Sequence, residues 1–164
     1  MGTLKLNVDA SVLAERDVIG VGGVIRAHDG VVLGAFTRRI TGRFDAFTAE
    51  LVAIRTGLLF AEDCGLKIFV TESDSFNAVK AVKDCSPRCL EGAIVDDINF
   101  LLGRASGQGC QFVSRNGNKV AHTLAQAAFS SLLDLSYVED YPPFIHELIL
   151  ADMASIVDSV SFPS

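Results

Sequence analysis

Apolar and polar residues alternate along the N-terminal part of the chain, and this pattern predicts β-strands. Within residues 4–9 every second side chain is apolar, as in a strand with one buried face. Two further runs rich in β-branched residues, 18–26 and 31–39, are joined by a turn that contains Asp29 and Gly30. Because the connections are short, we expect these three strands to form an antiparallel meander.

The apolar spacing changes to that of an α-helix in residues 47–62. Asp45 can cap the start of this helix, and Gly65 can end it. Residues 66–71 are rich in Ile, Phe and Val and predict a strand. Because this strand follows a helix, a right-handed crossover can place it parallel to the first strand. A further helix is expected over residues 76–82.

The next part of the chain predicts another helix, strand and helix. Residues 94–102 have the periodicity of an amphipathic helix, and residues 111–114 predict a short strand. After a turn, Asn118 can cap a helix over residues 120–128. Together these elements predict an α/β fold whose five-stranded mixed sheet has three antiparallel strands, then two parallel ones, with helices on both faces.

The hydrophobic pattern loosens after this last helix. We therefore expect one domain over residues 1–130, followed by a C-terminal extension over residues 131–164. The chain has 164 residues, of which 49% are hydrophobic and 21% are charged, and these values fit a single globular domain.

Composition also limits where the protein acts and what it binds. No apolar run reaches the roughly 18 residues that a membrane-spanning helix needs, and the first residues lack the pattern of a secretory signal. We therefore expect a protein without a membrane partner, inside the cell, in the nucleus or the cytoplasm. The formal net charge of -6 counts against a strong non-specific grip on phosphates, because such a grip requires clustered Lys and Arg.

Three acidic residues follow or face the predicted sheet. Asp9 ends the first strand, and Asp74 directly follows the strand expected beside it, so both should emerge at the same end of the sheet. Glu50 lies near the apolar face of its helix, where an ionised group needs a partner. Carboxylates gathered in this way repel one another, which raises the pKa of at least one of them unless a cation lies between them.

Oxygen ligands of this kind suit Mg²⁺ or Mn²⁺. Two such ions can activate a water molecule and stabilise the leaving oxygen of a phosphodiester. Each acid also has a simpler interpretation. Asp74, between two serines, can cap a helix; Glu50 can interact with a helix dipole; and Asp9 can form a turn at the end of a strand.

The order of these segments, over about residues 5–128, resembles the ribonuclease H-like domains that are abundant in plants and related to retroelement reverse transcriptases. The matching motifs are Leu6-Asn7-Val8-Asp9-Ala10-Ser11, Gly22-Gly23-Val24-Ile25-Arg26, Asp29-Gly30-Val31-Val32-Leu33, Thr48-Ala49-Glu50-Leu51-Val52-Ala53-Ile54, Glu72-Ser73-Asp74-Ser75 and Asn118-Lys119-Val120-Ala121-His122. The C-terminal segments Val138-Glu139-Asp140 and Leu150-Ala151-Asp152 are also similar to the end of the plant proteins.

This resemblance implies a ribonuclease H-like fold and an endonuclease that cleaves the RNA strand of RNA–DNA hybrids. In active members four acids hold two metal ions, and Asp9, Glu50 and Asp74 occupy three of those positions. The resemblance implies that Asp9 and Asp74 are the primary or bridging ligands and that Glu50 holds the second ion. The fourth position is usually Asp and here is His122, which binds Mn²⁺ better than Mg²⁺ and adds no negative charge.

His122 is expected to support a metal or product exit, or to be only a helix residue that faces the cleft. The resemblance also assigns substrate contacts to Ser11, Arg115 and Asn118. Arg115 is the best candidate for a phosphate contact, and its alternative is a solvated turn arginine.

The sequence departs from the family pattern in two further ways. Ala10 replaces a usual glycine, and a basic segment with interspersed aromatic residues is missing between the middle helices. There Lys80, Lys83 and Arg88 are isolated, and the chain contains no Trp. Weak nucleic-acid binding is expected. The alternative function is therefore a nucleic-acid-binding or scaffold module that retains the fold with little or no turnover.

Overall fold

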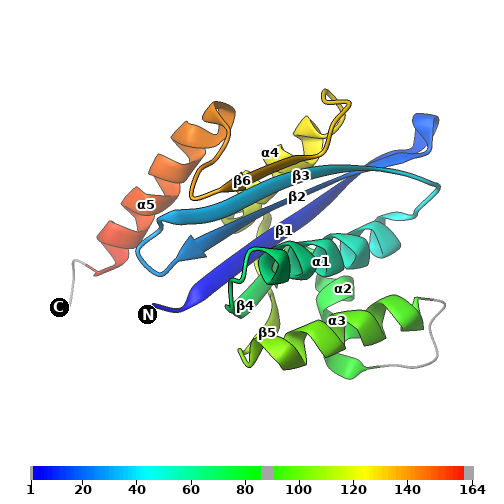
Figure 1. Cartoon of the computed structure of the whole chain (residues 1–164), viewed down its shortest axis with the longest axis horizontal. Coiled ribbons are helices and arrows are strands. Elements are labelled where there is room, and N and C mark those ends of the chain that lie inside the picture. The colour runs from blue at the N-terminus through cyan, green and yellow to red at the C-terminus, as the bar shows by residue number, and fades with distance from the viewer. Residues whose placement is uncertain (1, 86–90, 161–164) are drawn as a thin grey trace.

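The protein is seen here in a computed structural model that describes residues 2–85 and 91–160 (Figure 1). Arg88, assessed above from the sequence, lies outside these residues. In chain order the elements are β1 (Leu4–Leu13), η1 (Ala14–Arg16), β2 (Val18–Ala27), β3 (Val32–Thr41), α1 (Ala46–Asp63), β4 (Ile68–Ser73), α2 (Phe76–Asp84), α3 (Gly92–Ala105), β5 (Gly109–Phe112), η2 (Arg115–Asn118), α4 (Lys119–Ala127), β6 (Leu135–Val138), η3 (Pro143–Ile145) and α5 (His146–Val160).

A mixed sheet with strand order β5-β4-β1-β2-β3-β6 forms the centre of the fold. Strands β1, β2 and β3 are antiparallel neighbours, whereas β4 is parallel to β1 and β5 is parallel to β4. This arrangement confirms the predicted α/β class and the meander followed by parallel strands. The predicted count of five strands is wrong, because the sheet of the described residues has six.

The sixth strand comes from the segment that was expected to follow the sheet-forming part of the chain. Strand β6 pairs antiparallel with β3, from Gly34 opposite Val138 to Thr37 opposite Leu135. Tyr137 packs against a small apolar cluster on one face of the sheet. A strand of four residues is too short to show a clear alternation in the sequence, so its pairing is decided by these tertiary contacts.

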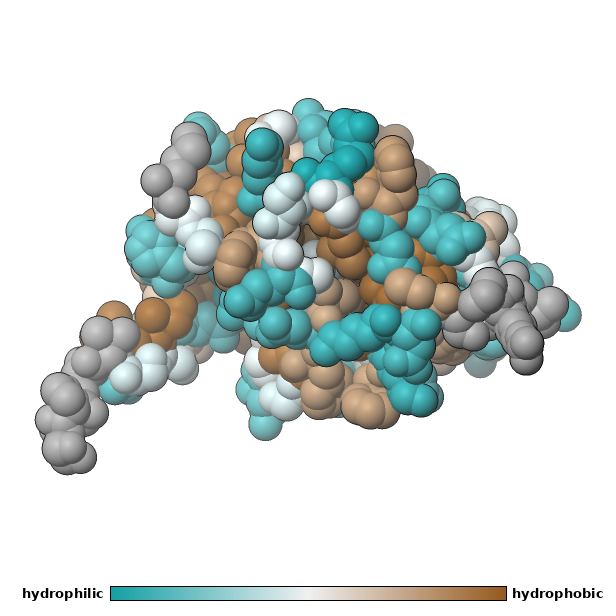
Figure 2. Space-filling model, turned by 90° about the horizontal axis from the view of Figure 1, so that it is seen from below, coloured by the Kyte–Doolittle hydropathy of each residue, from teal (hydrophilic) through white to brown (hydrophobic). Residues whose placement is uncertain are grey.

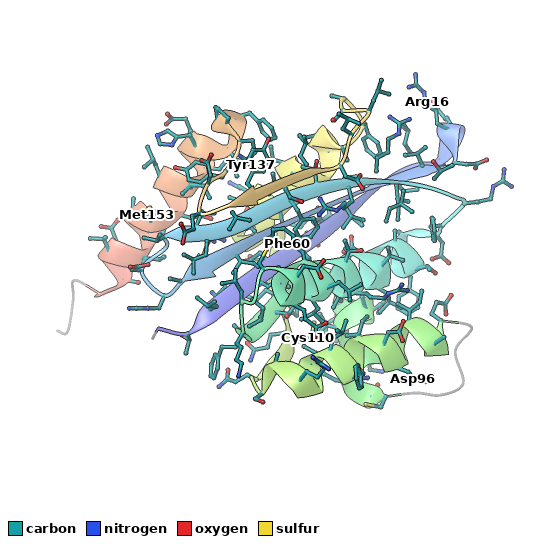
Figure 3. All side chains as sticks on the ribbon, in the orientation of Figure 1. Arg16, Phe60, Asp96, Cys110, Tyr137 and Met153 are labelled. Carbon is teal, nitrogen blue, oxygen red and sulfur yellow. The ribbon has the colours of Figure 1, made fainter. Side chains whose placement is uncertain are left out.

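Helices cover both faces of the sheet, as expected. Figure 1 shows α1, α2 and α3 on one side and α4 and α5 on the other. The larger core lies under α1 and includes Leu6 and Val8, both fully buried, together with Phe60. The second core includes Val24, the α4 residue Leu124 and the partly buried Tyr137 and Met153. Figure 3 labels Phe60 beside α1, and Tyr137 and Met153 near β6 and α5.

The first strand is longer than predicted. Residues 4–9 were expected to form it, but β1 continues to Leu13 because it remains paired with β2, from Asp9 opposite Gly22 to Leu13 opposite Val18. The prediction that Asp9 ends the first strand is therefore wrong, and Asp9 lies within β1. The neighbouring strand β4 pairs with β1 only as far as Ser73 opposite Val8. The sheet therefore leaves Asp9 just beyond the end of β4.

The surface mixes polar and apolar groups. Figure 2 shows hydrophilic side chains interspersed with apolar ones on the face seen from below. Several aromatic side chains are exposed, among them Phe76, Phe100 and Phe112. Among the described residues, none of the helices combines the length and the apolar character that crossing a bilayer requires.

Candidate metal centre

Three carboxylates from separate parts of the chain lie together at the end of β4. Asp9 comes from β1, Glu50 from α1 and Asp74 from the residue after β4. One oxygen of each side chain lies within 4.8 Å of the others. Asp9 is buried, and Glu50 and Asp74 are half-buried. The acids predicted from the sequence thus form one cluster that can hold a cation.

Local structure removes the simpler interpretation of each acid. Helix α2 is capped by Ser75, whose Oγ accepts a hydrogen bond from the backbone N–H of Ala78, so Asp74 is not the cap. Helix α1 is capped by Asp45, as predicted. The helix dipole acts most strongly in the first turn, and Glu50 lies beyond that turn. Asp9 lies within a paired strand rather than in a turn.

The cluster has too much negative charge for its degree of burial. The pKa of Glu50 is raised to about 9, chiefly by burial and also by the nearby Asp9 and Asp74, while the backbone N–H of Ala10 opposes the shift. Within the described structure, Glu50 Oε2 is buried and has no hydrogen-bond partner. A proton or a cation must therefore neutralise this carboxylate.

Asp74 is affected in the same direction. Burial raises its pKa, as does the neighbouring Asp9, whereas Arg115 and His122 act against the rise. A set of three carboxylates with an unpartnered buried oxygen fits a hard divalent cation such as Mg²⁺ or Mn²⁺. The residues present are therefore suited to the metal expected from the sequence.

His122 contacts the most buried acid of the cluster. Its Nδ1 lies 2.7 Å from Asp9 Oδ2, and its side chain is 51% exposed. With Nδ1 protonated, the ring donates a hydrogen bond to Asp9, and Nε2 is not used in this contact. His122 therefore does more than face a cleft from its helix, because it contacts Asp9, one of the three acids of the candidate metal site.

Two glycines in β2 allow α4 to bring His122 this close. A Cβ atom added at Gly22, which pairs with Asp9, would lie 2.2 Å from the backbone nitrogen of Ala125. A Cβ at Gly20 would lie 2.1 Å from the carbonyl oxygen of the same residue. Only glycine leaves room for the helix backbone here. The sequence pattern predicted the strand that contains these glycines but gave no sign of this packing role.

A cleft of about 420 Å³ opens beside the carboxylates. Its lining residues are Asp9, Ala10, Asp74, Arg115, Asn116, Lys119, His122, Thr123 and Leu148. Arg115 lies in the cleft, as expected for a residue that contacts phosphate. Lys119 was missed in the sequence, although its position beside Asn118 at the start of a predicted helix was a usable signal. Arg115 and Lys119 therefore line the same cleft as Asp9 and Asp74.

Ser11 and Asn118 are placed differently from Arg115. Ser11 is half-buried, shares one face of β1 with Asp9 and is not among the residues that line the cleft. Asn118 is 1% exposed, and its Nδ2 donates to the carbonyl of Val8 at 2.9 Å. It occupies the N-cap position of α4 but makes no capping hydrogen bond, so the predicted cap is wrong. Its buried contacts favour a positioning role over a substrate contact.

An aromatic pair lies next to Asp74 on the β5 side of the sheet. The rings of Phe76 and Phe112 have centroids 5.9 Å apart in an edge-to-face arrangement. They are 61% and 52% exposed, respectively. Register pairs Phe112 with Ser73, the residue before Asp74. The sequence pattern gave no prediction for this pair.

Residues 7–128 match the sequence profile of the reverse transcriptase-like family. The chain belongs to this family. No match was found among curated proteins.

Solved structures similar to this reverse transcriptase-like protein include ribonucleases H. RNase H1 from the archaeon Halobacterium salinarum is 22% identical, with a TM-score of 0.70, and the match covers 79% of this chain and 98% of that one. The N-terminal RNase H domain of a Mycobacterium tuberculosis protein is 20% identical, with a TM-score of 0.66, over 79% of this chain and 95% of that one.

A third similar structure is LC11-RNase H1, isolated from compost by a metagenomic approach and solved in complex with an RNA/DNA hybrid. That structure is 17% identical, with a TM-score of 0.66, over 78% of this chain and 97% of that one. These likenesses establish the ribonuclease H-like fold of the reverse transcriptase-like chain. Its expected plant origin stays a prediction.

Proposed function

We propose that this protein is a metal-dependent endonuclease that hydrolyses the RNA strand of RNA–DNA hybrids. The observation that carries the proposal is the convergence of Asp9, Glu50 and Asp74, whose oxygens lie within 4.8 Å of one another and include a buried oxygen without a hydrogen-bond partner. The fold is that of proteins named as ribonucleases H, one of which was solved with an RNA/DNA hybrid.

The carboxylates would hold Mg²⁺ or Mn²⁺, with Asp9 and Asp74 as primary or bridging ligands and Glu50 toward a second ion. When bound, two such ions supply an activated water and stabilise the leaving oxygen. The protein's own groups fix the geometry: the paired strands β1 and β4 hold the two aspartates, and His122 orients the carboxylate of Asp9.

Substrate contacts would come from both sides of the carboxylates. Arg115 and Lys119 line the cleft and can contact phosphate oxygens. The exposed rings of Phe76 and Phe112 offer an apolar surface on which a base or sugar can stack. With a net charge of -6 and few cations at the site, we expect weak and strongly salt-dependent binding.

The decisive experiment is cleavage of a labelled RNA–DNA hybrid by the purified protein in Mg²⁺ and, separately, in Mn²⁺. Asp9→Asn and Asp74→Asn should each reduce the rate by at least about 100-fold, more than the loss typical of a residue outside the ligand shell. Glu62→Gln is a matched control, because Glu62 is an exposed acid paired with Arg104 on α3. Full activity in Asp9→Asn would defeat the assignment.

A second candidate function is a nucleic-acid-binding module with little or no turnover. The observation that favours it is His122 at the fourth acidic position, where it donates to Asp9 in place of adding a carboxylate. Calorimetric titration with Mg²⁺ and Mn²⁺ separates the two. Hybrid binding without any measurable binding of either metal would favour the module over the nuclease.

A further inference from the structure

Helix α5 is joined to the sheet by an ion pair between Arg26 of β2 and Asp152. The Nη1 atom of Arg26 donates to Asp152 Oδ2, and the two side chains are 11% and 32% exposed. The apolar face of α5 supports the same contact, because Ile149 is 2% exposed within the second core. An ion pair shielded to this degree constrains the helix, since loss of one partner leaves a charge without compensation.

The guanidinium of Arg26 continues this contact into the sheet. Its Nη2 donates to Asn7 Oδ1 at 3.1 Å. Asn7 is 1% exposed, and its Nδ2 donates to Glu72 Oε2 at 2.9 Å and to Asn118 Oδ1 at 3.2 Å. The amide of Asn7 is therefore engaged on both ends, and its orientation depends on the position of Arg26.

Asn118 completes the path to the metal centre. Its Nδ2 donates to the backbone carbonyl of Val8, the residue before Asp9, at the point where β4 stops pairing with β1. Asn118 also directly precedes α4, the helix that carries His122. One buried amide therefore touches both the strand that holds Asp9 and the helix that holds its histidine partner.

We propose that Asp152 and Arg26 are positioning residues for the metal centre, and that they act through Asn7 and Asn118. In this role α5 does more than cover the sheet: it sets the distance between Asp9 and the helix that carries its partner. The inference rests on the proposed metal site and adds to it a regulating structural element outside residues 7–128.

The test compares three variants by Mn²⁺ affinity and by thermal stability. Arg26→Lys keeps a cation opposite Asp152 but lacks the fork that reaches Asp152 and Asn7 together. Asp152→Ala removes the anchor. Both should weaken Mn²⁺ affinity on the order of tenfold, the size typical of a lost outer partner of a metal ligand. Ile149→Ala is the control: it should lower thermal stability and leave Mn²⁺ affinity unchanged.

Wild-type Mn²⁺ affinity in both Arg26→Lys and Asp152→Ala would overturn the inference. So would an equal loss of affinity in Ile149→Ala, because α5 would then act only through general stability. NMR signals of the Asn7 and Asn118 side-chain amides provide a readout without metal, and both should move in Arg26→Lys. A wild-type protein that binds no Mn²⁺ would instead overturn the proposed function. Unchanged amide signals of Asn7 and Asn118 in Arg26→Lys would overturn the proposed positioning role of Arg26 by themselves.

Discussion

His122 Nδ1 lies 2.7 Å from Asp9 Oδ2, so a histidine contacts the most buried carboxylate of the candidate metal centre. An aspartate at this position would add an oxygen ligand in place of a hydrogen-bond donor. The identity of this one side chain therefore sets both the charge of the site and its preference among metals.

His122→Asp is expected to raise Mg²⁺ affinity about tenfold, because an additional carboxylate favours a hard cation. The preference for Mn²⁺ over Mg²⁺ should fall at the same time. Calorimetric titration with each metal measures both effects. His146→Asp, a change on α5 beside Tyr141, controls for the added charge, and an equal gain in that variant would contradict a local effect.

Glu50 should make the metal-free protein less stable at alkaline pH. Its folded pKa is raised to about 9 from an ordinary value of 4.5, so folding binds a proton between these values and stability is lost as pH rises through this window. In EDTA, unfolding by urea should cost up to about 4 kcal/mol less at pH 8 than at pH 5, because each pH unit within this window removes about 1.4 kcal/mol.

Glu50→Gln should remove most of this pH dependence and stabilise the metal-free protein at pH 8. Excess Mg²⁺ should do the same for the wild type by neutralising the cluster. Glu62→Gln, which alters an exposed acid, should behave as wild type. If wild type and Glu50→Gln show the same pH profile in EDTA, the pKa of Glu50 is not raised in the folded protein.

Arg115→Ala and Lys119→Ala should each weaken hybrid binding about fivefold, the equivalent of roughly 1 kcal/mol for a lost phosphate contact. The slope of log affinity against log salt should become shallower by about one unit per residue. Fluorescence anisotropy at several salt concentrations measures both. Lys80→Ala is the control because Lys80 is an exposed cation paired with Asp84, and a matching loss there would indicate a diffuse charge effect.

Replacing Phe76 and Phe112 together by Ala should weaken hybrid binding by about 1–3 kcal/mol if one base stacks on the pair. The expected kinetic signature is a higher KM with little change in kcat, because neither ring belongs to the carboxylate cluster. Phe100→Ala is matched in exposure, since Phe100 is 65% exposed on α3. The same KM for the double variant and the control would show that the pair lies off the substrate path.

Gly22→Ala should lower stability by about 1–3 kcal/mol, the usual cost of overpacking, because the added methyl group meets the backbone of Ala125. It should also weaken Mn²⁺ binding by pushing α4 and His122 away from Asp9. Gly103→Ala in α3 meets nothing within 4 Å and should raise stability by up to about 1 kcal/mol. Chemical denaturation of both variants tests the pair of opposite effects.

The sequence predicted the three acids of the candidate site better than it predicted the edge strand β6 and the contacts between distant residues. The order of strands and helices placed Asp9 and Asp74 at one end of the sheet, because a parallel strand after a crossover must end beside the first strand. Glu50 was found from its position on an apolar helix face. These inferences needed only local periodicity and chain order.

Other features depend on contacts between distant residues and leave little trace in a single sequence. Strand β6 has four residues and is defined by its pairing with β3. Asn118 has the sequence context of a helix cap, yet its amide donates to Val8, the last residue of β1 that pairs with β4. The ion pair of Arg26 and Asp152 joins residues 126 positions apart.

The contact of Arg26 with Asp152 has a practical consequence for trimming the protein. A fragment cut to residues 7–128 would retain all three acids and His122. It would lack Asp152, so the guanidinium of Arg26 would lose its counterion. It would also uncover Val24 and Leu124, which now pack with Ile145 and Ile149. If such a fragment were inactive or insoluble, the loss could result from truncation alone. Experiments on the three acids and His122 therefore need the longer chain.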